Sequence, residues 1–384
     1  MNSKEILRDL IAFPTVSRDP NRDLIDYCDA LLQEAGAETI HIEDATRSKA
    51  NLYATIGPAD RPGVALSGHT DVVPVDGQDW SRPPFELTEA DGKLFGRGAA
   101  DMKGFVACAL VAAQAAGERD LTTPLHLALS YDEEIGCVGV RSLIDHLAAA
   151  PFRPRFCIVG EPTSLAVATG HKGKTAARVE VTGREAHSAL APSGVNAIYL
   201  AADLISEIRQ LQTGIETSGA RDGDYDVPYT TLHVGRIDGG VALNIVPNKA
   251  SFLFEIRNLI GDEPDALLTK IRTAAERIAA DYQSTAPEVE FAIDVFNTYP
   301  PLDTPPDAEV ANFVKSLTGA NGTIKVAFGT EGGLFDRDLS VPTVICGPGS
   351  MAQGHKPDEF ITQSQLDQCD AMLARLIDRL ETGI

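Results

Sequence analysis

The sequence predicts an α/β protein in which a mostly parallel sheet flanked by helices is interrupted by a smaller α+β domain. Short apolar runs alternate with helical periodicity in residues 1–173 and again in 298–384. Between them, in 174–297, apolar residues instead alternate along longer strands. A chain of 384 residues is also too long for one ordinary hydrophobic core. We therefore expect one domain from 1–173 and 298–384, with 174–297 inserted as a second.

Each element of the first domain follows from its local pattern. Helical spacing of apolar residues predicts helices, and short apolar runs bounded by Gly, Pro or polar residues predict strands. The expected helices are 3–10, 22–35, 105–116, 138–149, 310–317 and 364–380. The expected strands are 39–42, 51–56, 64–67, 125–130, 156–159, 325–328 and 343–346. Strand and helix alternate, which favours parallel pairing through crossover helices.

The inserted domain has a different order of elements. Strands are expected at 174–182, 230–237, 250–256 and 289–295, with helices at 195–212 and 264–282. The resulting order of strand, helix, strand, strand, helix, strand is that of a ferredoxin-like unit. The segment 297–307 contains four prolines, which suits an extended return to the first domain.

Composition limits the classes of partner and compartment. The net charge of −22 argues against nucleic acid or an anionic membrane as partner, since both require a basic face. We find no secretory signal in residues 1–15 and no apolar run long enough to cross a bilayer. The six cysteines are scattered without a CxxC pair, so we expect buried free thiols and a cytoplasmic protein.

Acidic and imidazole side chains recur where predicted strands end. Open α/β sheets place their ligand sites at the carboxyl ends of the strands. A single His or Asp in a loop is usually solvated surface, but several converging strand ends indicate a metal site. Such strand ends are followed by His69, the acidic run 132–134, Glu161 and His355, and Asp101 follows a Gly-Arg-Gly turn and opens a helix.

The motifs that contain these residues resemble those of a known family. "SGHTDVVP", "GRGAADMKG", "DEEIG", "GEPT" and "GPGSMAQGHKPDE" occur in this order and together resemble the M20 family of dinuclear zinc amidohydrolases and peptidases. The resemblance covers nearly the whole chain, including "GREAHSALAPSGVNAI" in the inserted domain. It implies a zinc-peptidase-like catalytic domain and an inserted domain that serves as a lid and in dimerisation.

The resemblance also implies a ligand set. His69 and Glu161 would bind one divalent ion, Glu134 and His355 the other, and Asp101 would bridge the two. Imidazole and carboxylate ligands without thiolate suit Zn²⁺, with Co²⁺ or Mn²⁺ plausible in its place. A mononuclear site stays open as an alternative. The resemblance further implies a cis peptide bond after Asp101.

Further residues take their expected roles from the same likeness. Asp71 would accept the other ring N–H of His69 and orient it. Glu133 would be the general base, and His187 would stabilise the oxyanion. Asn244 and Arg257 would hold the substrate's carboxylate, Arg257 through its planar fork.

These expectations define a reaction and its alternatives. Glu331, in a segment that resembles the family's substrate loop, has no assigned role. The resemblance implies hydrolysis of the N2-acyl amide of an amino acid, with N2-acetyl-L-ornithine of arginine biosynthesis as the expected substrate. Another deacylase or a small peptidase of the family, such as a desuccinylase acting on succinyl-diaminopimelate, is the nearest alternative. A non-catalytic binding protein on the same fold is the other. A homodimer is expected, in which His187 reaches the partner's active site.

Overall fold

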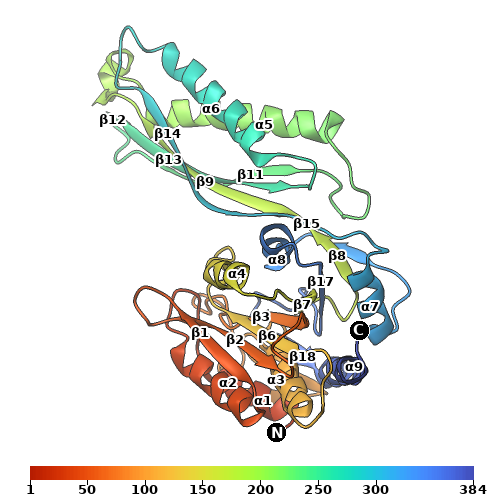
Figure 1. Ribbon diagram of the computed structural model, residues 1–384. Coiled ribbons are helices and arrows are strands. Elements are labelled where there is room, and N and C mark those ends of the chain that lie inside the picture. Colours follow the sequence, from red (N-terminus) through yellow and green to blue (C-terminus); the bar gives the residue numbers. More distant parts are fainter. The chain divides into compact units, whose positions relative to one another are not determined.

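The structure is a computed structural model that describes residues 1–384 (Figure 1). The chain divides into two compact units, each formed by residues that contact one another more than the rest. The first unit comprises Met1–His171, Leu302–Val326 and Thr330–Ile384, and the second comprises Lys172–Pro301 and Ala327–Gly329. These limits differ by a few residues from the expected 1–173/298–384 and 174–297. Gly329 falls with the second unit because the ring of Tyr299 packs directly on its Cα, where a Cβ would collide with it.

The first unit is built on a nine-stranded mixed sheet with the order β1-β2-β6-β3-β7-β17-β8-β15, in which β16 also pairs with β8. Its strands are β1 (Glu38–Glu43), β2 (Ala50–Ile56), β3 (Val64–His69), β6 (Leu125–Ser130), β7 (Phe156–Pro162), β8 (Ala168–His171), β15 (Leu302–Asp303), β16 (Ile324–Val326) and β17 (Thr343–Gly347). The four central strands β6, β3, β7 and β17 are parallel, and most pairings at the margins are antiparallel. The expectation of a mainly parallel sheet is therefore confirmed.

Helices cover both faces of this sheet (Figure 1). They are α1 (Ser3–Ala12), α2 (Arg22–Glu34), α3 (Lys103–Gly117), α4 (Val140–Ala149), α7 (Glu309–Thr318), α8 (Gly332–Leu339) and α9 (Gln363–Thr382). Helix α3 is apolar around almost its whole circumference and is buried, with α1 and α9 packed against it. Gly160 of β7 allows this packing, because a Cβ at that position would overlap the ring of Phe105 on α3.

Several elements of the first unit were not expected from the sequence. A small antiparallel sheet is formed by β4 (Thr88–Ala90), β5 (Lys93–Phe95) and β18 (Phe360–Thr362), in the order β18-β5-β4. Strands of three residues carry too little periodicity to be recognised. Helix α8 and strand β8 were missed as well, since both are short and rich in Gly or polar residues.

The second unit has the expected ferredoxin-like order. Strands β9 (Gly173–Thr182), β11 (Thr231–Gly239), β13 (Lys249–Asn258) and β14 (Glu290–Tyr299) form an antiparallel sheet with the order β11-β13-β9-β14. Helices α5 (Ala197–Ser218) and α6 (Pro264–Ala280) cover one face of it and bury its core (Figure 1). A two-stranded ribbon of β10 (Ala186–His187) and β12 (Ile245–Val246) and a short 3₁₀ helix, η1 (Ser188–Ser193), complete the unit.

The structure bears on two expectations, the state of the cysteines and the length of the apolar helices. All six cysteines are buried and unpaired, as expected of free thiols in hydrophobic surroundings. None of the helices combines the length and the apolar composition needed to cross a bilayer.

Candidate metal centre

The carboxyl ends of four neighbouring parallel strands supply most of the candidate ligands. His69 is the last residue of β3, and Glu161 lies near the end of β7. Glu133 and Glu134 follow β6, while His355 lies in the loop after β17. Because parallel strands end on the same side of a sheet, residues far apart in sequence meet there.

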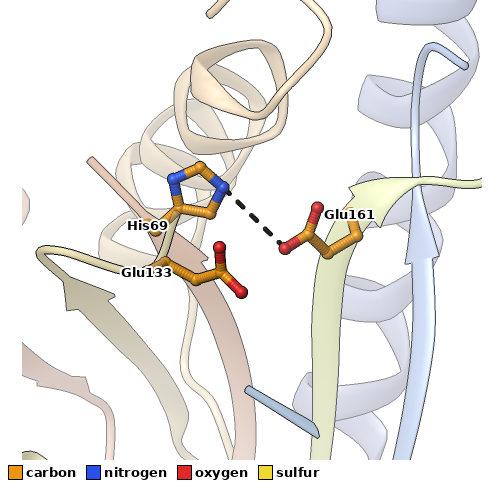
Figure 2. Close-up of side chains that lie close together, drawn as sticks. All are labelled: His69, Glu133 and Glu161. Atoms are coloured by element: carbon orange, nitrogen blue, oxygen red, sulfur yellow. Dashed lines mark ion pairs between the residues drawn. The ribbon is translucent and has the colours of Figure 1, made fainter. Parts of the chain in front are cut away.

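His69 is held in one orientation by its own loop. Its Nδ1 lies 2.9 Å from the main-chain carbonyl oxygen of Asp71, and because a carbonyl only accepts, Nδ1 donates. Its Nε2 is thereby free of a proton in the neutral ring and faces two carboxylates. Asp101 Oδ1 lies at 3.1 Å, and Glu161 Oε1 lies at 3.8 Å (Figure 2). A neutral imidazole with a free Nε2 is the form that binds a metal.

Asp71 contributes differently from the expectation. Its carboxylate lies 3.6 Å from His69 Nδ1, farther than its carbonyl oxygen. The carboxylate instead accepts hydrogen bonds from Ser17 Oγ at 2.6 Å and from the backbone N–H groups of Glu133 at 3.0 Å and Glu134 at 3.3 Å. Asp71 therefore orients the ring through its main chain and fixes the acidic loop through its side chain.

Asp101 presents its two carboxylate oxygens to two different imidazoles. Oδ1 faces His69 Nε2 at 3.1 Å, and Oδ2 faces His355 Nε2 at 3.2 Å. His355 Nε2 also lies 3.0 Å from Glu134 Oε2. The peptide bond from Asp101 to Met102 is cis, as the resemblance implied.

The loop after β6 directs the side chains of both Glu133 and Glu134 toward the other candidate ligands. Asp132 has a left-handed backbone with φ +53°, which ends the extended course of β6, and its carboxylate pairs with buried Lys49 at 2.6 Å. Ligand atoms of Glu133 lie with those of His69 and Glu161 within 4.8 Å of one another, and those of Glu134 lie within the same limit of His69 and Asp101. An extended segment would have sent the two neighbours to opposite faces.

Four carboxylates concentrate negative charge in this cluster, and histidines are the basic side chains that face them. His69 is 1% exposed, and Asp101 and Glu161 are each 3% exposed. No lysine or arginine forms an ion pair with Asp101, Glu133, Glu134 or Glu161. Burial and the neighbouring Glu134 raise the pKa of Glu133 to about 8, and burial with Asp101 raises that of Glu134 to about 7. Buried carboxylates of this number are stable as anions only beside cations, and divalent ions among them fit the donor set.

The pKa values of Asp101 and His355 shift in opposite directions. Burial alone would raise the pKa of Asp101, but hydrogen bonds from His355 and His69 hold it below its ordinary value. The carboxylates of Asp101 and then Glu134 raise the pKa of His355 to about 10. Divalent ions bound here would replace these protons, so their binding would release protons.

Two of the expected second-unit residues lie side by side. His187 in β10 pairs with Ile245 in β12, and the N–H of Ser188 donates to the carbonyl oxygen of Asn244 at 3.0 Å. Both His187 and Asn244 are exposed. The Nδ1 of His187 accepts the Ala189 N–H at 3.1 Å, so the neutral ring carries its proton on Nε2 and offers it as a donor.

Arg257 is not brought to these two residues within one chain. It lies near the far end of β13, while the β10–β12 ribbon adjoins the start of that strand. The ten residues of β13 span about 30 Å at about 3.3 Å each. Arg257 Nη1 donates to Tyr299 Oη at 2.8 Å, and the guanidinium pairs with Glu255 at 3.2 Å.

Of three buried charged residues near the centre, Glu331 was named from the sequence without a role, and Arg97 and Glu359 were not singled out. Glu331 is fully buried and accepts hydrogen bonds from the hydroxyls of Ser67 and Ser130, and burial raises its pKa to about 6. Arg97 and Glu359 form a buried ion pair at 2.7 Å. Arg97 and Glu359 lie within motifs quoted for the resemblance, but a motif does not identify the residues that a side chain contacts.

The sequence of this chain is similar to a known protein family along most of its length. The family model described as "Peptidase family M20/M25/M40" matches residues 65–379. An acetylornithine deacetylase of Myxococcus xanthus is 37% identical over 376 residues, covering 97% of this chain and 95% of that protein. One from Pasteurella multocida is 34% identical over 382 residues, covering 97% of each.

Solved structures share the fold at lower identity. An M20 family metallo-carboxypeptidase from Sulfolobus solfataricus superposes with a TM-score of 0.81 at 18% identity, covering 100% of both chains. A dinuclear metal binding peptidase of the M20 family from Bacillus subtilis has a TM-score of 0.68 at 17% identity, covering 100% of this chain and 98% of that one.

Proposed function

This chain belongs to peptidase family M20/M25/M40, and from that premise we propose that it hydrolyses N2-acetyl-L-ornithine to L-ornithine and acetate, a step of arginine biosynthesis. The family match and the near full-length likeness to two acetylornithine deacetylases make the protein a metal-dependent amidohydrolase of the M20 family. The substrate is the part that is proposed, because ligand motifs do not distinguish one acyl amino acid from another.

The observation that carries the reaction is the position of Asp101. Its two oxygens face imidazoles that come from different strand ends, and each imidazole faces a further glutamate. We propose that His69 and Glu161 hold one ion, that Glu134 and His355 hold the other, and that Asp101 bridges them. Bound there, two divalent ions would lower the pKa of a water molecule and polarise the amide carbonyl. The donor set suits Zn²⁺, with Co²⁺ or Mn²⁺ as replacements.

Glu133 is proposed as the proton carrier of the reaction. Its carboxylate is buried beside the ligands, and its Oε1 accepts a hydrogen bond from Cys137 Sγ at 3.2 Å. Burial raises the pKa of Glu133, and bound divalent ions would lower it toward the working range of a general base. Glu133 then takes a proton from the attacking water and returns it to the leaving N2 amine.

His187, Asn244 and Arg257 are proposed to act on the substrate. The Nε2–H of His187 donates to the oxyanion of the tetrahedral intermediate, and Asn244 and Arg257 bind the substrate's carboxylate. One acyl amino acid is far shorter than the strand that separates Asn244 from Arg257 within a chain. Contact with both therefore requires two copies of the chain.

We accordingly propose a homodimer in which His187 and Asn244 serve the partner's active site. The loop around Asn244 supports this, because Val241 is 88% exposed and Leu243 fully exposed, which is unfavourable for aliphatic side chains unless another surface covers them.

The six buried thiols are consistent with a cytosolic enzyme.

A substrate panel tests the proposed reaction. Release of free amine would be measured with metal-loaded enzyme on N2-acetyl-L-ornithine, on N2-formyl amino acids and on N-succinyl-diaminopimelate. We expect the highest kcat/KM for N2-acetyl-L-ornithine, with Glu133→Gln protein as the blank. A higher kcat/KM for the succinylated substrate would replace the proposal with a desuccinylase, and no amine release from any substrate would favour a binding protein.

Subunit mixing tests the dimer. Inactive Glu133→Ala and His187→Ala proteins would be combined under conditions that exchange subunits. If His187 acts on the partner, the heterodimer carries both lesions in one active site and keeps the other intact, so activity returns in part. Proven exchange without recovery of activity would rule out action across the dimer.

A further inference from the structure

Arg97 and Glu359 form a buried ion pair that lies outside the proposed ligand set. Both side chains are 1% exposed, and Arg97 Nη1 donates to Glu359 Oε2 at 2.7 Å. The small sheet makes this meeting possible: Phe95 of β5 pairs with Phe360 of β18, which places Glu359 beside Gly96, whose N–H donates to the Glu359 carbonyl oxygen at 2.9 Å.

The second oxygen of Glu359 reaches the bridging ligand. Oε1 accepts the backbone N–H of Ala100 at 2.9 Å and that of Asp101 at 3.1 Å. A single carboxylate oxygen thus satisfies two consecutive backbone donors at the residue that faces both imidazoles. Without it, these N–H groups would be buried and unpaired, and the backbone that aims Asp101 would lose its anchor.

The other end of the pair reaches the loop of His355. Arg97 Nη1 also donates to the carbonyl oxygen of Lys356 at 3.3 Å, and Nη2 donates to Gln78 Oε1 at 2.5 Å. Gln78 Nε2 in turn donates to the carbonyl oxygen of His355 at 3.2 Å. The backbones of two ligands, Asp101 and His355, are therefore held by one connected network.

We propose that Arg97 and Glu359 are positioning residues that set the affinity of the ion site formed by Glu134 and His355. Two of the three side chains around that site, Asp101 and His355, depend on this network, whereas the other site shares only Asp101 with it. The inference rests on the proposed metal centre. Loss of outer partners of metal ligands typically costs 10–100-fold in affinity.

The test separates the hydrogen-bond acceptor from the buried charge. Glu359→Leu removes both, whereas Glu359→Gln keeps a carbonyl oxygen for the N–H groups of Ala100 and Asp101. Asp370→Asn is the matched control, because Asp370 is a partly buried carboxylate of the first unit that bonds Ser3 and lies outside the network. Both dissociation constants of Zn²⁺ would be measured on metal-free protein, together with amide hydrogen exchange at Ala100 and Asp101.

We expect Glu359→Leu to raise one of the two dissociation constants by about 10–100-fold and to speed exchange at Ala100 and Asp101. Glu359→Gln should restore most of the Zn²⁺ affinity and of the protection from exchange. Asp370→Asn should leave the dissociation constants and the exchange rates unchanged. Unchanged Zn²⁺ affinities in folded Glu359→Leu protein would overturn this inference and leave the metal centre standing. The inference would also be overturned if Glu359→Leu and Asp370→Asn both weakened binding of the two ions equally.

Two further outcomes are also decisive. Wild-type protein that binds no metal would overturn the metal centre itself and this inference with it. If Glu359→Leu does not fold, Gln78→Ala decides, because Gln78 is only partly buried and tethers His355 through a single hydrogen bond. That variant should weaken the same ion, and two unchanged dissociation constants would overturn the proposal.

Discussion

The two units carry functional side chains of opposite character. In the first unit the candidate ligands are mostly buried and are held by one another, by Asp71 and by the ends of parallel strands. In the second unit His187 is exposed on a two-stranded ribbon, Asn244 is exposed in the loop just before β12, and Arg257 is only partly buried. Buried carboxylates need ions to be stable, while exposed donors need a substrate or a partner surface. Substitutions in the two units should therefore fail in different ways.

The largest effect is expected at Glu133. Glu133→Gln keeps the shape of the side chain but cannot carry a proton, so kcat should fall by about 10²–10⁴-fold or more. Metal content, measured by elemental analysis, should stay at the wild-type value. Asp370→Asn, an acid of the same unit outside the centre, serves as control. Near-normal turnover with full metal content would remove Glu133 from the role of base.

The next effect belongs to the second unit and should leave the metals untouched. His187→Ala removes the proposed oxyanion donor, which is expected to lower kcat by about 10²–10³-fold. His233→Ala changes an exposed histidine of the same unit and should have wild-type kinetics. Loss of bound metal in His187→Ala protein would contradict the division of roles between the units.

A smaller effect is expected at Arg257. Loss of a charge-assisted contact to the substrate's carboxylate is worth about 1.5–3 kcal/mol, so Arg257→Ala should lower kcat/KM by about 10–100-fold, mainly through KM. Arg257→Lys should recover little, because an ammonium lacks the planar fork. Arg236→Ala, at an exposed arginine of the same sheet, is the control. Equal KM values for wild type and Arg257→Ala would show that this residue does not bind substrate.

The smallest effect is a dependence of stability on pH that only metal-free protein should show. The pKa values of Glu133, Glu134 and His355 are raised to about 8, 7 and 10, above their ordinary values of 4.5, 4.5 and 6.5. Folded metal-free protein therefore binds more protons than unfolded chain, and its stability falls as pH rises between about 5 and 9.

Thermal unfolding at several pH values checks this dependence. We expect the midpoint of metal-free protein to fall by roughly 5 °C between about pH 5.5 and 8.5, and metal-loaded protein to lack this fall, because bound ions replace the protons. Parallel curves for the two forms would show that these groups do not hold the ions.

Whether a helix or strand could be predicted depended on the length of its periodic stretch of sequence. Long periodic stretches gave the alternating elements of the first unit and the order of the second, while three-residue strands β4, β5 and β18 gave none. Asp71 shows a finer limit: its place two residues after His69 suggested a contact with the ring, but whether main chain or side chain makes it depends on backbone geometry.

The sequence by itself determined the longer helices and strands, the family and the identity of the ligand candidates, because these depend on periodicity and on residues within short motifs. Only the tertiary structure decided which residues meet. Pairing of β5 with β18 joins Arg97 to Glu359, 262 positions away. The length of β13 separates Asn244 from Arg257, which the sequence assigned to one task. Contacts of this kind arise from strand register and chain packing, which no local pattern encodes.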